Sequence, residues 1–161
     1  MSLIEVKNLK KYFKVPTGIN HAVDDVSFSI EKGETLGVVG ESGCGKSTLG
    51  RTIIHLQEPT AGQIFLNGED ITHVKGKKLD RIRDKMQIVF QDPYSSLNPR
   101  IRIESTIKEP LKHSGRFHGK NEIQEEANRL MELVGIDRPE ARAKLYPWNF
   151  SGGMRQRSVL A

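Results

Sequence analysis

The spacing of apolar residues changes along the chain, and this change predicts strands first and helices later. Val26, Phe28 and Ile30 alternate with serines, and residues 4–7 alternate in the same way. A period of two is typical of strands with one buried face. Pro16 and the nearby glycine place a loop between these two segments. We therefore predict an antiparallel sheet in the N-terminal region.

Three short apolar runs predict further strands. Residues 35–39 read Thr-Leu-Gly-Val-Val, a run typical of a buried parallel strand. Residues 63–66 and 86–90 are also apolar. The pair Asn67-Gly68 follows the second run and indicates a tight turn. A short helix is expected around residues 77–84.

Beyond Pro93 the apolar spacing becomes helical. Ile103, Ile107 and Leu111 fall on one face of a predicted helix, which Pro110 should bend or break. A second stripe runs from residue 123 to residue 134.

The ends of these helices also carry sequence signals. Asn121 and Gln124 resemble a capping box at the start of the second helix, and Gly135 should end it. Pro139 and Pro147 bracket a short helical stretch. A last segment follows Ser-Gly-Gly at residues 151–153.

Composition limits the classes of protein to which the chain could belong but does not identify one. The chain has 161 residues, of which 36% are hydrophobic, enough for an ordinary domain with a core. No apolar run is long enough to span a bilayer. The single cysteine, Cys44, cannot form an internal disulfide, which favours a reducing, cytosolic setting. The net charge of +5 lies in residues 81–161, where acids are interspersed, so nucleic-acid binding is not expected.

Residues 40–48 carry the clearest chemistry in the chain. They read Gly-Glu-Ser-Gly-Cys-Gly-Lys-Ser-Thr and match the phosphate-binding pattern G-x-x-x-x-G-K-[ST]. Glycines allow the backbone N–H groups to turn towards a phosphate. Lys46 would reach the β- and γ-phosphates, and the hydroxyl of Ser47 would bind Mg²⁺. A helix starting at Lys46 would add its N-terminal dipole.

The cofactors expected here are therefore a nucleoside triphosphate, ATP or GTP, and Mg²⁺. The predicted contact set is Gly40, Glu41, Ser42, Gly43, Cys44, Gly45, Lys46, Ser47 and Thr48.

Two more motifs resemble those of ATP-binding-cassette (ABC) ATPases. Residues 91–99, Gln-Asp-Pro-Tyr-Ser-Ser-Leu-Asn-Pro, resemble the Q-loop, and residues 150–157, Phe-Ser-Gly-Gly-Met-Arg-Gln-Arg, resemble the signature motif. They follow the phosphate loop in the expected order. Their variants are most similar to the ATP-binding subunits of oligopeptide and dipeptide importers. The resemblance covers essentially the whole chain.

This resemblance implies a fold. It is the α/β fold of P-loop NTPases, with an N-terminal antiparallel β subdomain, a partial parallel-sheet core and a helical subdomain. Residues 1–91 would form the β subdomain with the phosphate-loop core, and residues 92–157 the helical signature subdomain. In this family Ser151, Gly152, Gly153 and Gln156 would bind the ATP of a second cassette, while Gln91 would contact Mg²⁺ or the attacking water and act in catalysis.

The same resemblance implies partners and a location. The helical subdomain would dock on transmembrane permease subunits, and a second ATP-binding subunit would complete the dimer. The protein would then lie peripherally on the cytoplasmic face of the membrane. Phe13 matches the ring that stacks on adenine in this family, although the adjacent Tyr12 is an alternative.

The family pattern extends beyond residue 161. It continues with an apolar strand that ends in an acid for Mg²⁺, a catalytic glutamate and a switch histidine. We therefore expect the C-terminal part of the core to be missing, and this chain alone to bind ATP without turnover. Asp92 is an alternative candidate for the acid. Other systems of the superfamily remain alternatives: an importer of another substrate, or a DNA-repair or chromosome-organising ATPase, although no heptad run interrupts residues 47–150.

Overall fold

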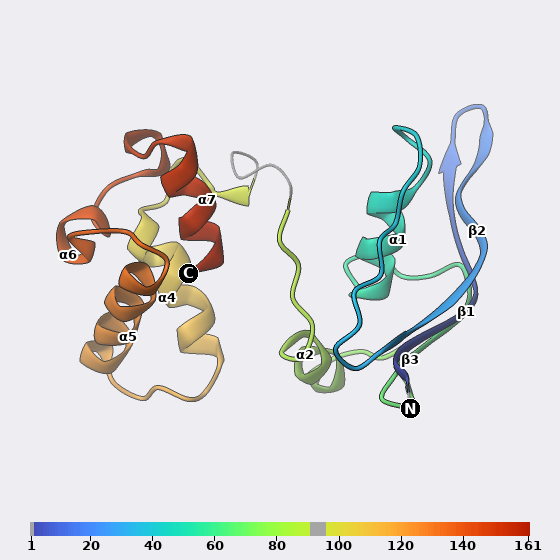
Figure 1. The fold of residues 1–161 in the computed structure, drawn as a ribbon, viewed down its shortest axis with the longest axis horizontal. Helices are drawn as coiled ribbons and strands as arrows, with labels where there is room; N and C mark the ends of the chain where they lie inside the picture. Colours follow the sequence, from blue (N-terminus) through green and yellow to red (C-terminus); the bar gives the residue numbers. More distant parts are fainter. Residues whose placement is uncertain (1, 91–95) are drawn as a thin grey trace. The chain divides into compact units, whose positions relative to one another are not determined.

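The computed structural model describes residues 2–90 and 96–161, and its contacts divide the chain into two compact units (Figure 1). The first unit is Met1–Ile88 and the second is Val89–Ala161. Each unit has its own hydrophobic core. The predicted boundary between residues 91 and 92 falls on residues outside the description, so the division into 1–91 and 92–157 stays a proposal.

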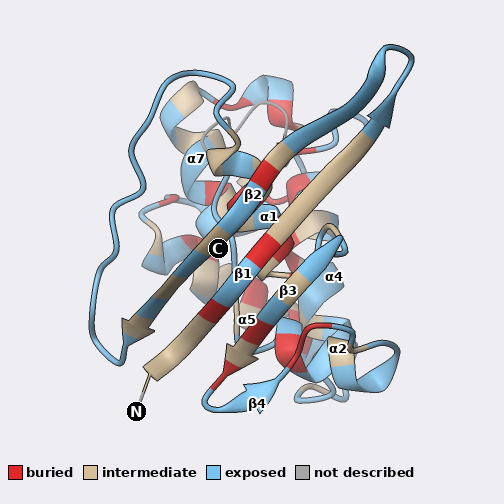
Figure 2. Cartoon of the chain, turned by 90° about the vertical axis from the view of Figure 1, so that its right-hand side faces the viewer, coloured by how far each residue is buried: buried red, intermediate tan, exposed pale blue. Residues whose placement is uncertain are grey.

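The first unit is built on a four-stranded antiparallel sheet. Its long hairpin consists of β1 (Ser2–Val15) and β2 (Gly18–Glu31), and β3 (Ala61–Leu66) and β4 (Glu69–Asp70) follow. The strand order is β2-β1-β3-β4 (Figure 2). The predicted N-terminal antiparallel sheet is thus confirmed.

The turn between β3 and β4 also follows its prediction. Asn67 and Gly68 have φ values of 52° and 79°. Two consecutive positive φ values are the mark of the type I′ hairpin turn that Asn-Gly favours.

Two helices complete the first unit, α1 (Lys46–Ile53) and α2 (Lys77–Arg83). Each contributes one buried apolar side chain to the core on one face of the sheet. The buried core residues of this unit are Val6, Leu9, Val23, Leu49, Ile64, Leu66, Ile71 and Ile82. A small core of this kind must therefore hold the helix that follows the glycine loop against the sheet.

A β-bulge at Asn8 lets β1 bury two residues of opposite parity. Val6 pairs with Phe28 and Leu9 with Val26, so between these two pairs β1 contains one more residue than β2. Asn8 adopts a φ of 46°, which asparagine tolerates better than most residues. Its amide Nδ2 donates to Asp25 Oδ1 at 3.0 Å, and its backbone N–H donates to Ser27 Oγ at 2.8 Å. These bonds stabilise the irregular backbone.

Two of the predicted strands do not form. Residues 34–41 and 86–90 adopt neither helix nor strand. A strand exists only with a hydrogen-bonded neighbour, and among the described residues neither segment has one. Val39 is 93% exposed and Val89 59%. The described strand pairs are all antiparallel, so the predicted parallel pairing is not observed in this part of the chain.

The second unit is helical. It contains α4 (Ile103–His113), α5 (Lys120–Leu133), α6 (Pro139–Arg142), a 3₁₀ turn (Pro147–Asn149) and α7 (Gly152–Leu160). Both predicted apolar stripes supply its core. The buried core residues are Leu97, Ile103, Ile107, Ala127, Met131, Ile136, Ala143 and Phe150.

Two local sequence signals in this unit, a proline and a capping box, do not have the predicted effect on its helices. The helix α4 continues through Pro110 to His113, so the proline does not break it. The predicted capping box at Asn121 is wrong, because α5 begins at Lys120 with Gly119 as N-cap, so Asn121 already lies inside the helix. There the carboxylate of Glu122 accepts the N–H of His118 at 3.0 Å instead.

The end of α5 follows its prediction. Gly135 has a φ of 76°, and its N–H donates to Glu132 O at 2.9 Å while Ile136 N–H donates to Met131 O at 2.8 Å. This pair of bonds is the Schellman motif, in which a left-handed glycine closes a helix.

Gly62 is where β3 crosses the bulge of β1, and its substitution tests this packing. Gly62 has a φ of 90°, and a Cβ there would lie 2.4 Å from Asn8 O. Gly62→Ala should lower the free energy of unfolding by about 2–4 kcal/mol, from backbone strain plus overpacking.

Gly68→Ala is the matched control. Gly68 has a similar φ of 79°, but no atom lies within 4 Å of the added Cβ. It should cost only the backbone strain, about 1–2 kcal/mol. Urea unfolding measures both variants, and equal losses would contradict the close approach at Gly62.

Candidate phosphate-binding site

The loop between β2 and α1 curls tightly around the start of the helix. Gly45 is the N-cap of α1 with a φ of 95°, a left-handed conformation that glycine adopts without strain. A Cβ at Gly45 would lie 1.9 Å from Ala22 O on β2. The loop therefore rests directly on the backbone of the hairpin, and only glycine fits at this contact.

The side chain of Lys46 folds back into the loop. Its Nζ donates to Gly40 O at 2.8 Å and to Glu41 O at 2.6 Å. The Sγ atom of Cys44 lies 3.5 Å from the same Nζ. The ammonium group thus ties the first residues of the loop to the first residue of the helix and sets a positive charge within the curl.

Several backbone donors of this curl have no partner among the described residues. In the described part of the chain, we find no hydrogen bond from the backbone N–H groups of Gly43, Gly45, Lys46 or Ser47. The first N–H groups of a helix have no partner within the helix. Donors grouped around an ammonium make a concave site for an anion. Phosphate binding by this loop therefore stays a prediction that these partnerless donors and the Lys46 ammonium favour.

The other predicted loop residues line the same curl. Glu41, Ser42 and Cys44 are exposed, and so is Ser47, whose hydroxyl is available to a metal ion. Thr48 is half-buried in the first turn of α1, where its carbonyl accepts a bond from a threonine hydroxyl one turn later.

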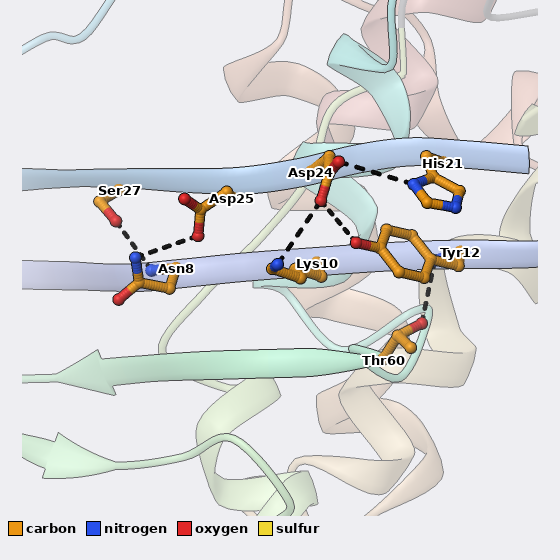
Figure 3. Close-up of polar contacts among 8 residues, drawn as sticks. All are labelled: Asn8, Lys10, Tyr12, His21, Asp24, Asp25, Ser27 and Thr60. Atoms are coloured by element: carbon orange, nitrogen blue, oxygen red, sulfur yellow. Dashed lines mark hydrogen bonds and ion pairs between the residues drawn. The ribbon is translucent and has the colours of Figure 1, made fainter.

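Tyr12 and Phe13 are adjacent on β1 and point to opposite faces of the sheet. The Tyr12 hydroxyl donates to Asp24 Oδ1, and its ring stacks on His21 with centroids 3.9 Å apart (Figure 3). The bond to Asp24 is the main reason why the pKa of Tyr12 is raised. The same bond chiefly lowers the pKa of Asp24. Tyr12 is therefore engaged on the outer face.

Phe13 lies on the face that carries the core. Lys11 shares that face with Phe13 and pairs across the hairpin with the buried Val23. The Nζ atom of Lys11 lies 4.9 Å from the centroid of the Phe13 ring. The ring is half-buried and stacks on no other aromatic side chain among the described residues. It remains available for a planar ligand.

The residues of the predicted signature motif begin α7 in the second unit. Ser151 is the N-cap, and its Oγ accepts the N–H of Met154 at 3.3 Å. Gly152 and Gly153 form the first turn, and Gln156 is exposed on the same helix.

The neighbouring side chains hold this helix start in place. The Nε atom of Arg155 donates to Phe150 O at 2.9 Å, and the Phe150 ring is buried in the core of the second unit. Sequence reasoning missed this contact, because an arginine that closes over its own helix start has no pattern of its own.

Two predictions fall outside the described residues. Gln91, predicted for Mg²⁺ and water, and Asp92, the alternative acid, both belong to residues 91–95. Their roles stay predictions. Among the described residues, no three His, Cys, Asp or Glu side chains gather as a metal site would require.

Comparison with known proteins assigns the family. A family model described as ABC transporter matches residues 23–161, most of the chain. The chain belongs to the ABC transporter family. The matched range includes both the phosphate loop and the segment that begins α7.

Individual relatives agree with this family. The oligopeptide transport ATP-binding protein OppF of Bacillus subtilis is 49% identical over 99% of this chain and 52% of its own length. The dipeptide transport ATP-binding protein DppF of Haemophilus influenzae is 44% identical over 99% of this chain and 50% of its own length. The chain thus spans about half the length of these curated relatives.

A solved structure with the same fold is the dimeric, post-hydrolysis ATP-binding cassette MJ0796 bound to ADP and Pi. The two structures superpose with a TM-score of 0.81 at 27% sequence identity. The superposition covers 98% of this chain and 67% of the MJ0796 chain. The P-loop NTPase fold of an ABC cassette, predicted from the motifs, is therefore confirmed. Within the described residues, no helix of this ABC family member is both long and apolar enough to cross a membrane.

Ser151 can be tested as a helix cap independently of any ligand. Ser151→Ala should lower the stability of the second unit by about 1 kcal/mol, because the Met154 N–H loses its acceptor. Ser151→Asp should retain stability, since aspartate caps as well as serine. Urea unfolding followed by the fluorescence of Trp148, the only tryptophan of the chain, reports on this unit. Equal stability of the two variants would contradict the cap.

Proposed function

We propose that this chain is the ATP-binding part of an ABC transporter subunit that couples ATP binding and hydrolysis to the import of oligopeptides or dipeptides. The observation that supports the proposal is the loop at residues 40–48, in which Lys46 Nζ folds back onto the loop and several backbone N–H groups have no partner among the described residues. The names of the relatives at 44–49% identity support peptide import.

The loop residues would divide the work of holding the triphosphate. Backbone N–H groups of Gly43, Gly45 and Ser47 would bind phosphate oxygens, and Lys46 would balance the charge of the β- and γ-phosphates. Ser47 and Gln91 would hold Mg²⁺. When bound, Mg²⁺ neutralises charge between the transferred and leaving phosphates.

Phe13 would stack on adenine. The geometry supports Phe13 over Tyr12, because the Tyr12 ring already stacks on His21 and its hydroxyl already binds Asp24. Stacking on a ring reads a π-face and few polar groups. The site would then discriminate weakly between ATP and GTP.

The start of α7 would serve a second subunit. Ser151, Gly152, Gly153 and Gln156 would bind the γ-phosphate of ATP held by a partner cassette, with ATP acting as a switch on closure. The dimeric form of the related cassette MJ0796 supports this arrangement. Transmembrane permease subunits would be the remaining partners, which would hold the protein peripherally at the cytoplasmic face of the membrane.

The first functional prediction concerns Lys46. Lys46→Ala removes a charge-assisted interaction of about 1.5–3 kcal/mol, so ATP affinity should fall about 10- to 150-fold. Isothermal calorimetry measures the affinity. Lys32→Ala is the charge-matched control, because Lys32 is exposed in the turn after β2. If both variants bind ATP equally well while folded, the loop does not hold the phosphates.

The second concerns Phe13. Phe13→Ala should weaken ATP and GTP binding alike, by about 5- to 150-fold, if a stacked base contributes about 1–3 kcal/mol. Phe65→Ala is a matched control, since Phe65 is half-buried with Lys7 Nζ 4.9 Å from its ring centroid, as Lys11 is from Phe13. Phe13→Trp should retain binding. If Phe65→Ala lowers the ATP affinity as much as Phe13→Ala does, Phe13 is not the ring that stacks on the base.

A further inference from the structure

The hairpin has several register shifts besides the bulge at Asn8, and one of them lies beside the two candidate rings. Lys11 pairs with Val23 and Tyr12 pairs with His21, so Ala22 is the extra residue on β2. A bulge of this kind leaves one residue outside the ladder and redirects its backbone. Here the redirected residue is the one whose carbonyl meets the phosphate loop.

The contact between Ala22 and the loop leaves no room for a side chain at Gly45. A Cβ added to Gly45 would lie 1.9 Å from Ala22 O and 3.1 Å from Ala22 C. Phe13 follows Tyr12, the residue that pairs next to the bulge. The bulge at Ala22 therefore adjoins both the ring proposed for the base and the loop proposed for the phosphates.

Polar side chains bind each other across the outer face of this bulge. We call Lys10, Tyr12, His21 and Asp24 the outer cluster (Figure 3). Asp24 is its centre: it accepts from the Tyr12 hydroxyl, and its carboxylate lies 3.5 Å from His21 Nδ1 and 3.8 Å from Lys10 Nζ. On β2, His21 directly precedes Ala22, and Asp24 lies two residues after it, within the neighbouring register shift between Val23 and Val26.

On its other side, β1 is bonded at this point to Thr60, the residue that precedes β3. Tyr12 N–H donates to Thr60 Oγ1 at 2.9 Å, and Thr60 N–H donates to Lys10 O at 2.8 Å. These bonds therefore hold the part of β1 that lies opposite the bulge, while the outer cluster links it to β2.

We propose that Tyr12 and Asp24 are positioning residues: by clamping the bulge at Ala22, they set the spacing between Phe13 and the phosphate loop. This inference rests on the proposed function, because that spacing matters only to a ligand that spans a base and a triphosphate. Neither residue touches the ligand; they fix the backbone from which both contacts project. A backbone already ordered in the binding geometry spares the ligand that ordering cost.

The decisive variant is the double substitution Tyr12→Phe with Asp24→Asn. It keeps both side-chain shapes but removes the hydroxyl donor and the carboxylate charge. ATP affinity should fall about threefold to tenfold, a loss of about 0.7–1.4 kcal/mol, which lies in the range of an ordinary hydrogen bond. Affinity for inorganic triphosphate, which has no base, should change less than about twofold. Calorimetry on the 161-residue chain measures both.

Asp25→Asn is the matched control. Asp25 is the next residue on the same strand, is exposed, and binds Asn8 at the other bulge. It changes the net charge by the same amount, and asparagine tolerates its φ of 56°. Its ATP affinity should equal that of the parent chain. If the double variant binds ATP as Asp25→Asn does, the clamp is refuted. If ATP and triphosphate lose affinity equally, the cluster only supports the fold and the proposal also fails.

A measurement without nucleotide separates this inference from the proposed function. The amide resonance of Gly45 should move in the double variant and stay in place in Asp25→Asn, because only the first alters the carbonyl at Ala22. If Lys46→Ala binds ATP as the parent does, the proposed function fails, and this resonance still decides whether the cluster controls the contact. An unmoved resonance overturns the inference. Tyr12→Phe alone serves the same measurements if the double variant does not fold.

Discussion

The architecture of the first unit depends on two places where backbones approach without side chains between them. Gly62 crosses β1 at the bulge of Asn8, and Gly45 rests on the carbonyl of Ala22 at the bulge of β2. At each place an irregularity in the hairpin meets a glycine from another segment. The hairpin thus fixes the position of the phosphate loop. A contact that excludes even a Cβ has no flexible side chain that could adjust to a shift of the loop.

These bulges also determine which side chains become the core. A regular strand would send Val6 and Leu9 to opposite faces, yet both are buried in one cluster. The extra residue at Asn8 rotates the strand so that both apolar side chains point inward. Burying a leucine or valine side chain contributes about 1.5–3 kcal/mol. This gain exceeds the cost of about 1–2 kcal/mol for one residue with positive φ.

Sequence patterns predicted those elements that depend on local chemistry. The β1–β2 hairpin, the Asn67-Gly68 turn, the helix after the glycine loop and the glycine end of α5 all form where expected. The bulges could not be predicted, since they depend on which residue of a distant strand lies opposite. The strand predicted for residues 35–39 does not form for a related reason. An apolar run forms a strand only when a neighbouring strand supplies its hydrogen bonds. The residues of 91–95 remain outside this comparison.

The charges on the two faces of the hairpin favour the inner face as the place where a nucleotide would lie. On the outer face the Asp24 carboxylate raises the pKa of the Tyr12 phenol and lies 3.8 Å from Lys10 Nζ, so that face carries one carboxylate beside one ammonium in the outer cluster. The inner face carries the Lys11 ammonium over Phe13, and the loop that rests on the hairpin holds Lys46. A triphosphate is attracted to cations and repelled by carboxylates. Because side chains alternate between the faces of a strand, Phe13, which we propose for the nucleotide, and Tyr12, which we propose as a positioning residue, lie on opposite faces although they are adjacent in sequence.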